Sequence, residues 1–239
     1  MKKYALGIDL GTSNSALAFC STDSEGPVEV LPVSQLLSFK AIGQQQSLPS
    51  ALYLPLAQEV DSASARLPWG DAQLFTGVVG EFARSHGALL PERLVTSAKS
   101  WLCNPHIDPE QPLLPWKSEL GERLVSPFAA SQRYLEHLRL AFLHHLSEQG
   151  ISASVDDCEI VLTVPASFDE VARIHTHSAA EAAGWREVTL LEEQQAAFYH
   201  WIAAAGEDWR EQVSTGDVVL ICDIGGGTAD FSLVVVSQQ

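Results

Sequence analysis

The feature that most constrains this chain is a glycine-rich turn between two apolar runs near its C-terminal end. Residues 218–236 read Val-Val-Leu-Ile-Cys-Asp-Ile-Gly-Gly-Gly-Thr-Ala-Asp-Phe-Ser-Leu-Val-Val-Val and predict two strands joined by a turn that carries two acids. A tight hairpin needs at most one or two glycines, so three in succession indicate a close approach to the backbone. Unobstructed N–H groups suit a phosphate, and the neighbouring acids suit a hydrated Mg²⁺. A glycine-rich surface turn is the plainer alternative.

A second stretch of the same design lies at the other end of the chain. Residues 4–19 run from an apolar segment to Asp9, then through Leu-Gly-Thr-Ser-Asn into another apolar segment. Two similar hairpins, each with an acid at its turn, indicate two related half-domains that face each other. A ligand shared between the two turns explains both of them.

Length and charge exclude several classes of protein. The 239 residues suffice for one large or two ordinary domains, and 46% hydrophobic with 18% charged residues is a globular composition. The net charge of −16 disfavours nucleic acid and anionic membranes as partners. No apolar run approaches the roughly 18 residues that a membrane span needs, and the N-terminus leads directly into a strand rather than a signal peptide. We therefore expect a cytoplasmic protein.

The N-terminal half combines a regular part with an irregular one. Residues 4–9, 15–20 and 28–33 predict a three-stranded antiparallel meander. The pattern then loosens over residues 34–116, which are interrupted by prolines and read as an inserted subdomain. Within that segment we expect short strands at 48–54 and 74–79, and short helices at 80–86 and 92–102.

Regular alternation returns in the second half. Ser126-Pro127 predicts the start of a long helix that ends at Gly150. A buried strand follows at 159–164, then a helix opened by a capping box at Ser167 and ended near Gly184. A strand at 188–191 and a helix at 193–205 complete two strand–helix units, so these strands are expected to be parallel. The fold class is therefore α/β, with a mixed sheet of meander and parallel strands flanked by helices.

These segments, taken together, resemble the DnaK-type heat-shock chaperone family of the actin-like ATPase superfamily. Its two phosphate motifs are similar to Ile8-Asp-Leu-Gly-Thr-Ser-Asn-Ser15 and to Asp223-Ile-Gly-Gly-Gly-Thr-Ala-Asp-Phe-Ser232. Its connecting motifs are similar to Val164-Pro-Ala-Ser-Phe168 and Leu191-Glu-Glu-Gln-Gln-Ala-Ala197. Order and approximate spacing match across nearly the whole chain. The resemblance implies a ribonuclease H-like, actin-like ATPase fold.

The resemblance also implies an ATP or ADP site with Mg²⁺ between two lobes. Asp9 and Asp223 would hold Mg²⁺ mainly through its waters. Glu193, with Asp9, Asp223 and Asp230, would position or polarise the attacking water. Phosphate binding would fall to Gly11, Thr12, Ser13, Asn14, Gly225, Gly226, Gly227 and Thr228. Without the family, Glu193 is equally explained as an acid at a helix N-terminus.

Two positions depart from the family pattern. The family has a lysine that reaches for the γ-phosphate where this chain has Arg84, which we expect to act there as a catalytic cation. Arginine keeps the charge but presents a planar fork, so the exchange is not conservative at a tight site. Lys99 lies nearby but aligns with a later family lysine. Gln194 stands where the family has a proline thought to switch between nucleotide states. Both changes put the hydrolysis rate in question.

The resemblance divides the chain into residues 1–215, a first lobe with its insertion at 34–116, and residues 216–239, the first hairpin of a truncated second lobe. It implies the ATP-binding part of a chaperone that controls peptide binding elsewhere, with unfolded peptides, a J-domain co-chaperone and a nucleotide-exchange factor as partners. A chain that ends here is expected to bind ATP weakly or not at all and to be inactive alone. A small-molecule kinase, a filament-forming actin-like ATPase and a pseudo-ATPase scaffold remain alternatives.

Overall fold

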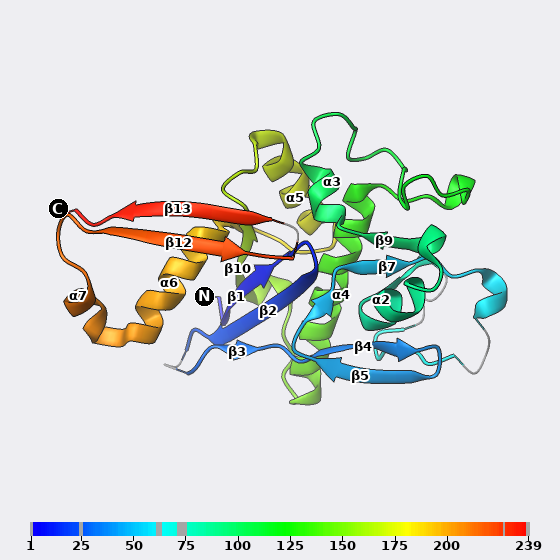
Figure 1. The fold of residues 1–239 in the computed structure, drawn as a ribbon. Helices are drawn as coiled ribbons and strands as arrows, with labels where there is room; N and C mark the ends of the chain where they lie inside the picture. Colours follow the sequence, from blue (N-terminus) through cyan, green and yellow to red (C-terminus); the bar gives the residue numbers. More distant parts are fainter. Residues whose placement is uncertain (1, 24–25, 61–63, 71–75, 227, 238–239) are drawn as a thin grey trace.

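A mixed sheet forms the centre of the molecule (Figure 1). The structure is a computed structural model, and it describes residues 2–23, 26–60, 64–70, 76–226 and 228–237. In the sheet the strands lie in the order β11-β10-β1-β2-β3. Their bounds are Val188–Glu192 (β11), Cys158–Val164 (β10), Tyr4–Asp9 (β1), Asn14–Ser21 (β2) and Glu29–Val30 (β3). Strands β1, β10 and β11 are parallel, whereas β2 and β3 are antiparallel to their neighbours. The predicted α/β class with a mixed sheet is confirmed.

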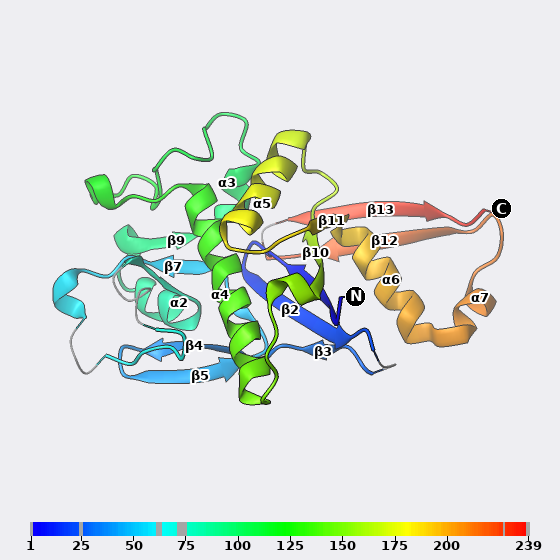
Figure 2. The ribbon, with the colours of Figure 1, turned by 180° about the vertical axis from the view of Figure 1, so that it is seen from behind.

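One face of this sheet carries the main hydrophobic core. Alternate residues of β1 and β10 point to that face, and Leu6 pairs with Ile160 while Ile8 pairs with Leu162. All four side chains are buried. They pack beneath helix α4, Pro127–Glu148, whose long axis crosses the sheet (Figure 2). Because side chains alternate along a strand, Asp9 and Thr163 belong to the opposite, less covered face.

Helix α4 begins and ends close to where its sequence signals predict. The Ser126 hydroxyl accepts a hydrogen bond from the Ala129 N–H at 3.0 Å, and Pro127 occupies the first helical position. Gly150 takes a positive φ of 74° just after the helix, a conformation that favours glycine. The apolar stripe that repeats at helical spacing is buried at Leu135, Leu138, Phe142 and Leu146.

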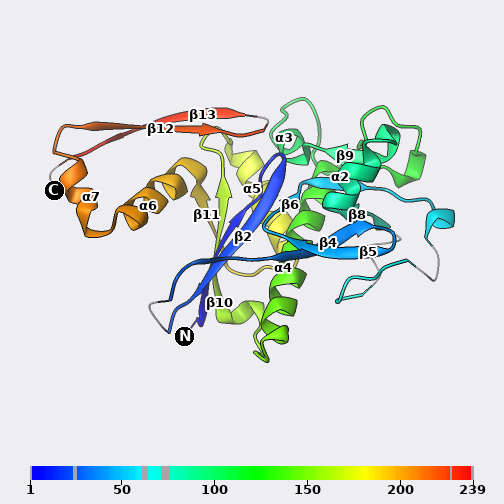
Figure 3. The same ribbon diagram turned by 60° about the horizontal axis from the view of Figure 1, so that its bottom comes forward.

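The segment between the meander and α4 forms a smaller body of strands and short helices to one side of the sheet (Figure 3). It contains the β4–β5 hairpin, Val33–Ser38 with Ala41–Gln45, and a three-stranded sheet ordered β8-β7-β9. The other bounds are Leu48–Pro49 (β6), Ala51–Tyr53 (β7), Val78–Val79 (β8), Glu81–Gly87 (α2), Leu94–Thr96 (β9) and Ala98–Leu102 (α3). The predicted helix at 80–86 and the strand at 48–54 are confirmed, the latter interrupted at Ser50.

Three elements in the first half of the chain differ from their predicted boundaries. The helix predicted over 92–102 is wrong, because residues 94–96 pair with β7 as a strand and Ser97 takes a left-handed φ of 56° before α3 begins. The β-branched Val95 and Thr96 favour that strand. The third meander strand is shorter than predicted, because the chain leaves the sheet after Val30. Residues 71–75 lie outside the described part of the chain, so only the end of the strand predicted at 74–79 is seen, as β8.

The two strand–helix units match their predictions except at one cap. Helix α5, Glu170–Ala182, begins after Asp169, whose carboxylate accepts the Ala172 N–H at 2.8 Å. The predicted cap at Ser167 is therefore two residues early, since Asp169 offers the stronger, charged acceptor. Helix α6 spans Glu193–Ala205 as predicted, and a short helix α7 follows at Trp209–Gln212.

The last element is an isolated hairpin that lies along α6 (Figures 1 and 2). Strand β12, Val218–Ile224, pairs antiparallel with β13, Ala229–Val235, and the two make a separate two-stranded sheet. Both predicted strands are therefore present, and the glycine turn between them points back toward the β1–β2 turn. In the described part of the chain, no helix combines the length and apolar character needed to cross a membrane.

Candidate functional site

The first wall of the candidate site is the turn between β1 and β2. Asp9 ends β1, and its carboxylate accepts a hydrogen bond from the Thr163 hydroxyl of the adjacent strand β10 at 3.4 Å. Gly11 makes the turn possible, because a Cβ there would lie 2.1 Å from the Asn14 carbonyl oxygen. Ser50 supports the turn from behind by donating its hydroxyl to the Gly11 carbonyl at 2.8 Å and its N–H to the Ser13 carbonyl at 2.9 Å.

The second wall is the glycine turn of the β12–β13 hairpin. A Cβ on Gly226 would lie 2.2 Å from the Ser13 hydroxyl, so the two turns touch, and any side chain there would displace that hydroxyl. Gly225 has room for a Cβ, whose nearest neighbour would be the Thr228 carbonyl at 3.6 Å. Close approach to another part of the chain therefore explains Gly226 directly. Gly227 lies outside the described residues.

Two further side chains close the site from different elements. Glu193 is the first residue of α6, directly after the end of β11. Lys99 comes from the short helix α3 on the other side of the site, and its ammonium donates a hydrogen bond to the Glu193 carboxylate. Only 9% of the Lys99 side chain and 15% of the Glu193 side chain are exposed, so this ion pair is largely shielded from water.

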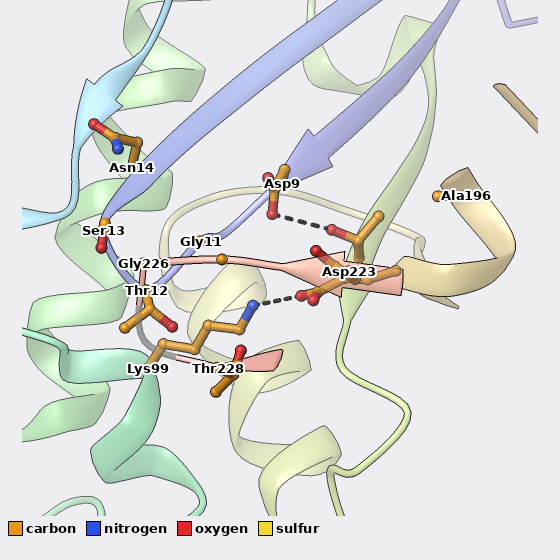
Figure 4. A pocket seen from close by; sticks show the side chains of 13 residues that line it. Asp9, Gly11, Thr12, Ser13, Asn14, Lys99, Ala196, Asp223, Gly226 and Thr228 are labelled. Atoms are coloured by element: carbon orange, nitrogen blue, oxygen red, sulfur yellow. Dashed lines mark hydrogen bonds and ion pairs between the residues drawn. The ribbon is translucent and has the colours of Figure 1, made fainter. Parts of the chain in front are cut away.

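These elements surround one pocket of about 380 Å³ (Figure 4). Lys99 points into it from α3, and Asp9 and Asp223 face it from the ends of β1 and β12. Its volume is within the range of small-molecule sites. The pocket is lined by Asp9, Gly11, Thr12, Ser13, Asn14, Lys99, Thr163, Glu193, Ala196, Asp223, Gly225, Gly226 and Thr228.

Two acids in the pocket, Asp9 and Glu193, have raised pKa values. The protein around Asp9 raises its pKa even though water reaches the side chain through the open pocket, and the charge of Asp223 raises it further. Burial likewise raises the pKa of Glu193, and Asp9 and Asp223 add to that effect. Lys99 opposes the rise at both Asp9 and Glu193. The described lining therefore includes three acids and one cation, and a further positive charge would stabilise the ionised acids.

The structure brings most of the predicted site residues together. Ten of them line the pocket: Asp9, Gly11, Thr12, Ser13, Asn14, Glu193, Asp223, Gly225, Gly226 and Thr228. Asp230 does not line it. It lies opposite Asp223 in the hairpin, and its Oδ2 atom is buried with no hydrogen-bond partner among the described residues.

Arg84, expected to act in the site, does not line the pocket. Arg84 is on α2, its guanidinium pairs with Glu81 one turn earlier, and 54% of its side chain is exposed. The Gly80 N-cap directs α2 along the β7 sheet, so this side chain leaves toward solvent rather than toward the two turns.

Sequence reasoning undervalued Lys99 and missed Thr163 and Ala196. The signal for Thr163 was available, because it is a polar residue near the end of a predicted strand, and it lies in register with Asp9. The direction of the Lys99 side chain could not be predicted from its own segment. A single helix was expected over 92–102, whereas the chain turns at Ser97 before α3 begins.

The lining of the pocket suits a hydrated metal ion together with a phosphate. Within the described residues no three His, Cys, Asp or Glu side chains converge closely enough to hold a metal ion by themselves. Two carboxylates facing an open, water-accessible pocket suit a cation that keeps most of its waters, as Mg²⁺ does. The turns on either side present small residues and backbone, which suit phosphate oxygens. The donor set therefore fits hydrated Mg²⁺ with a phosphate.

The comparisons with known proteins all indicate the same family. The model of the Hsp70 protein family matches residues 77–238. The chaperone protein HscA of Enterobacter sp. (strain 638) is 28% identical over 242 residues, a match that covers 99% of this chain and 33% of that protein. The HscA homolog of Pseudoalteromonas atlantica is 30% identical over 253 residues, with 99% and 33% covered. The HscA homolog of Pasteurella multocida is 28% identical over 243 residues with the same coverage. The chain thus spans about a third of the length of these relatives.

Proposed function

This chain belongs to the Hsp70 protein family, and on that premise we propose that it is the ATP-binding portion of a chaperone of this family, with Mg-ATP held between its two glycine turns. The observation that carries the proposal is the meeting of both turns at one pocket with acids at its ends. Two turns from distant parts of the chain each supply an acid and unobstructed backbone N–H groups. A single nucleotide whose phosphates are bound by both turns accounts for this arrangement.

In this proposal each wall has its own task. Thr12, Ser13 and the amides near Gly11 bind phosphate oxygens from one side, and Gly225, Gly226 and Thr228 bind them from the other. Asp9 and Asp223 orient the waters around Mg²⁺, and Thr163 holds the Asp9 carboxylate in place. When bound, Mg²⁺ neutralises the charge on the phosphates. The raised pKa of Asp9 indicates that a nearby cation would stabilise its ionised carboxylate.

Glu193 is the best placed group to accept a proton from a water in this pocket. Burial and the neighbouring acids raise its pKa, which improves a carboxylate as a general base. Asp230 lies directly opposite Asp223 in the hairpin, and its unpartnered buried oxygen can accept a hydrogen bond from a water. Phosphoryl transfer depends mainly on positioning and charge neutralisation, and these residues supply both.

The wider role is also a proposal. The named relatives are chaperones about three times as long as this chain. We infer that nucleotide turnover at this site controls peptide binding by a segment outside these residues. Unfolded peptides, a J-domain co-chaperone and a nucleotide-exchange factor are the expected partners of such a protein, and the cytoplasm is its expected location.

The test is a nucleotide titration followed by NMR of the isotope-labelled chain. With Mg²⁺ present, millimolar ATP and ADP should shift backbone signals of both turns, and chelation of Mg²⁺ should weaken binding. Asp9→Asn or Asp223→Asn should weaken Mg²⁺-dependent binding by about tenfold, the effect of one charge-assisted contact. Asp23→Asn, at an exposed position, is the matched control and should bind as the wild type does. The proposal fails if neither turn responds to either nucleotide.

A further inference from the structure

Two buried serine hydroxyls lie directly behind the β1–β2 turn. Ser15 is 0% exposed and Ser50 is 3% exposed, and their Oγ atoms are 2.9 Å apart. The Ser50 hydroxyl gives its single proton to the Gly11 carbonyl, so the hydrogen bond between the two serines is donated by Ser15. The hydroxyls therefore form a short chain of hydrogen bonds that ends on the backbone of the turn. Because a buried hydroxyl without a partner is costly, this chain has one favoured arrangement.

Ser50 comes from a different part of the molecule than the turn that it supports. It follows strand β6, which pairs with the start of β2 so that Pro49 lies opposite Asn14. Its own N–H donates to the Ser13 carbonyl at 2.9 Å. Directly after it begins β7, Ala51–Tyr53, the central strand of the small β8-β7-β9 sheet. Ser50 is thus the joint between the main sheet and the smaller body beside it.

The small sheet on the far side of this joint is tightly packed. Leu52 of β7 lies opposite Val79 of β8 on one side and Val95 of β9 on the other. All three side chains are at most 1% exposed. A packed sheet of this kind moves as a unit and transmits strain. Any movement of it relative to the main sheet therefore displaces Ser50 and the carbonyls bonded to it.

The front of the same turn faces the pocket. Thr12 and Ser13 line the pocket, and the Ser13 hydroxyl touches Gly226 of the other turn. Gly11 gives this turn little stiffness of its own, since glycine restricts the backbone least. The hydrogen bonds from behind therefore set the direction of the N–H groups in front.

We propose that Ser50 is a positioning residue that couples the orientation of the smaller body to the nucleotide pocket through the carbonyls of Gly11 and Ser13. This inference rests on the proposed function and names a means by which that site is regulated. Binding of a nucleotide at the turn and one placement of the small sheet favour each other, and the coupling is equal in both directions. Only hydrogen bonds and the packing angle of the small sheet change.

The experiment removes the Ser50 hydroxyl and follows both sides of the joint by NMR of the whole chain. Saturating Mg-ADP should shift the Thr12 amide signal and also the methyl signals of Leu52 and Val79, neither of which lines the pocket. Ser50→Ala should weaken Mg-ADP binding about fivefold, which corresponds to about 1 kcal/mol, the net value of one hydrogen bond. At saturation it should reduce the two methyl shifts at least about threefold while the Thr12 shift persists.

Two further variants control the measurement. Ser131→Ala is the matched control, because Ser131 is 0% exposed and its hydroxyl has no hydrogen-bond partner among the described residues. It should leave the affinity and the methyl shifts as in the wild type. Ser15→Ala removes the bond between the two serines and leaves the one from Ser50 to Gly11. Its affinity and methyl shifts should lie between those of the wild type and Ser50→Ala.

The outcomes separate this inference from the proposed function. Methyl shifts of full size in Ser50→Ala would mean that the signal travels by another element, and would overturn the role of Ser50 while nucleotide binding stands. Wild-type methyl signals that ignore a bound nucleotide, or equal losses in Ser131→Ala, would overturn it as well. A wild-type chain that binds neither ATP nor ADP overturns the proposed function and this inference together.

Discussion

At the scale of single residues, Gln194 has the least satisfied environment in the site region. It is 2% exposed, and neither its amide nitrogen nor its amide oxygen has a hydrogen-bond partner among the described residues. It follows Glu193 in the first turn of α6 and lines a second cavity between that helix and the β12–β13 hairpin. A buried amide without a partner costs about 1–3 kcal/mol. The residue that departs from the family pattern is therefore also destabilising here.

We predict that Gln194→Met raises the free energy of unfolding by about 1–2 kcal/mol, because it keeps the shape of the side chain and removes the unsatisfied amide. Urea unfolding followed by circular dichroism measures the change. Gln195→Met, at the exposed neighbouring position, serves as the control and should alter stability by no more than about 0.5 kcal/mol. Equal or lower stability of Gln194→Met would mean that the amide is satisfied in solution.

Which residues line the pocket could be predicted from the sequence where a motif defines the backbone. It could not be predicted where a side chain reaches the pocket from an element distant in sequence. Asp9 and Asp223 were correctly assigned to one pocket, because each follows a strand at the tip of a similar hairpin. Arg84 was expected in the site but lies outside the pocket, whereas Lys99 lines it. Both are basic residues in short helices of the same region, and only the directions of α2 and α3 separate them. Those directions depend on tertiary packing and on Ser97, which no local pattern reveals.

At the scale of elements, the β12–β13 hairpin is the least complete part of the fold. Its inner face lies against α6, whereas its outer face carries six large apolar side chains that are all more than half exposed: Val218, Leu220, Ile224, Phe231, Leu233 and Val235. They form cross-strand pairs, with Val218 opposite Val235 and Leu220 opposite Leu233. A continuous apolar face of this kind on a two-stranded sheet favours association with another surface.

We predict that the chain self-associates through this outer face. The double variant Leu220→Glu/Leu233→Lys places opposite charges in a cross-strand pair and should convert larger species to monomer in sedimentation velocity experiments. The control is Leu89→Glu, which changes an equally exposed leucine that is 76% accessible and far from the hairpin in sequence. A wild-type chain that is monomeric at every concentration contradicts the prediction, as does equal dissociation in the control.

The regular elements were predictable and the irregular ones were not. Helix α4 has a serine cap, a proline at its first position and a glycine after its end, so local chemistry defines both boundaries. Strand β9 has only three residues between two turns, and its identity comes from pairing with β7. Where pairing partners are distant in sequence, local propensity is a weak guide to structure.

At the scale of the whole molecule, His137 joins the main core to the smaller body beside it. It is a fully buried residue of α4, and its ring Nε2 lies 2.9 Å from the Ser34 carbonyl oxygen of β4. The Trp69 ring packs edge-on against it at 5.2 Å. Burial lowers the pKa of His137 to about 4, from an ordinary value of 6.5. The imidazole is therefore neutral in the folded protein at any pH near neutrality.

This depressed pKa predicts how the stability of the whole chain depends on pH. Between pH 6.5 and about 4 the unfolded state binds a proton at His137 that the folded state does not bind, so stability falls as the pH falls through that window. The loss of stability from this group is absent above pH 6.5 and reaches about 3 kcal/mol at most once the pH is below about 4. Urea unfolding at a series of pH values measures it.

The control for that experiment is a second histidine. His137→Gln should flatten the pH dependence in the window, whereas His106→Gln, at an exposed position, should leave the slope as it is. The assignment to His137 is refuted if the slope survives His137→Gln unchanged.

The pairing of β1 with β10 has a consequence for how the chain is made. Tyr4 lies in register with Cys158, so one side of the N-terminal hairpin has no neighbour until β10 has been synthesised. At about 5–20 residues per second, that interval lasts about 8–30 s on a ribosome. The acid at the β12 turn emerges later still. In the proposed function nucleotide needs both turns, so its affinity arises only after β12 has been synthesised, and it cannot assist the earlier stages of folding.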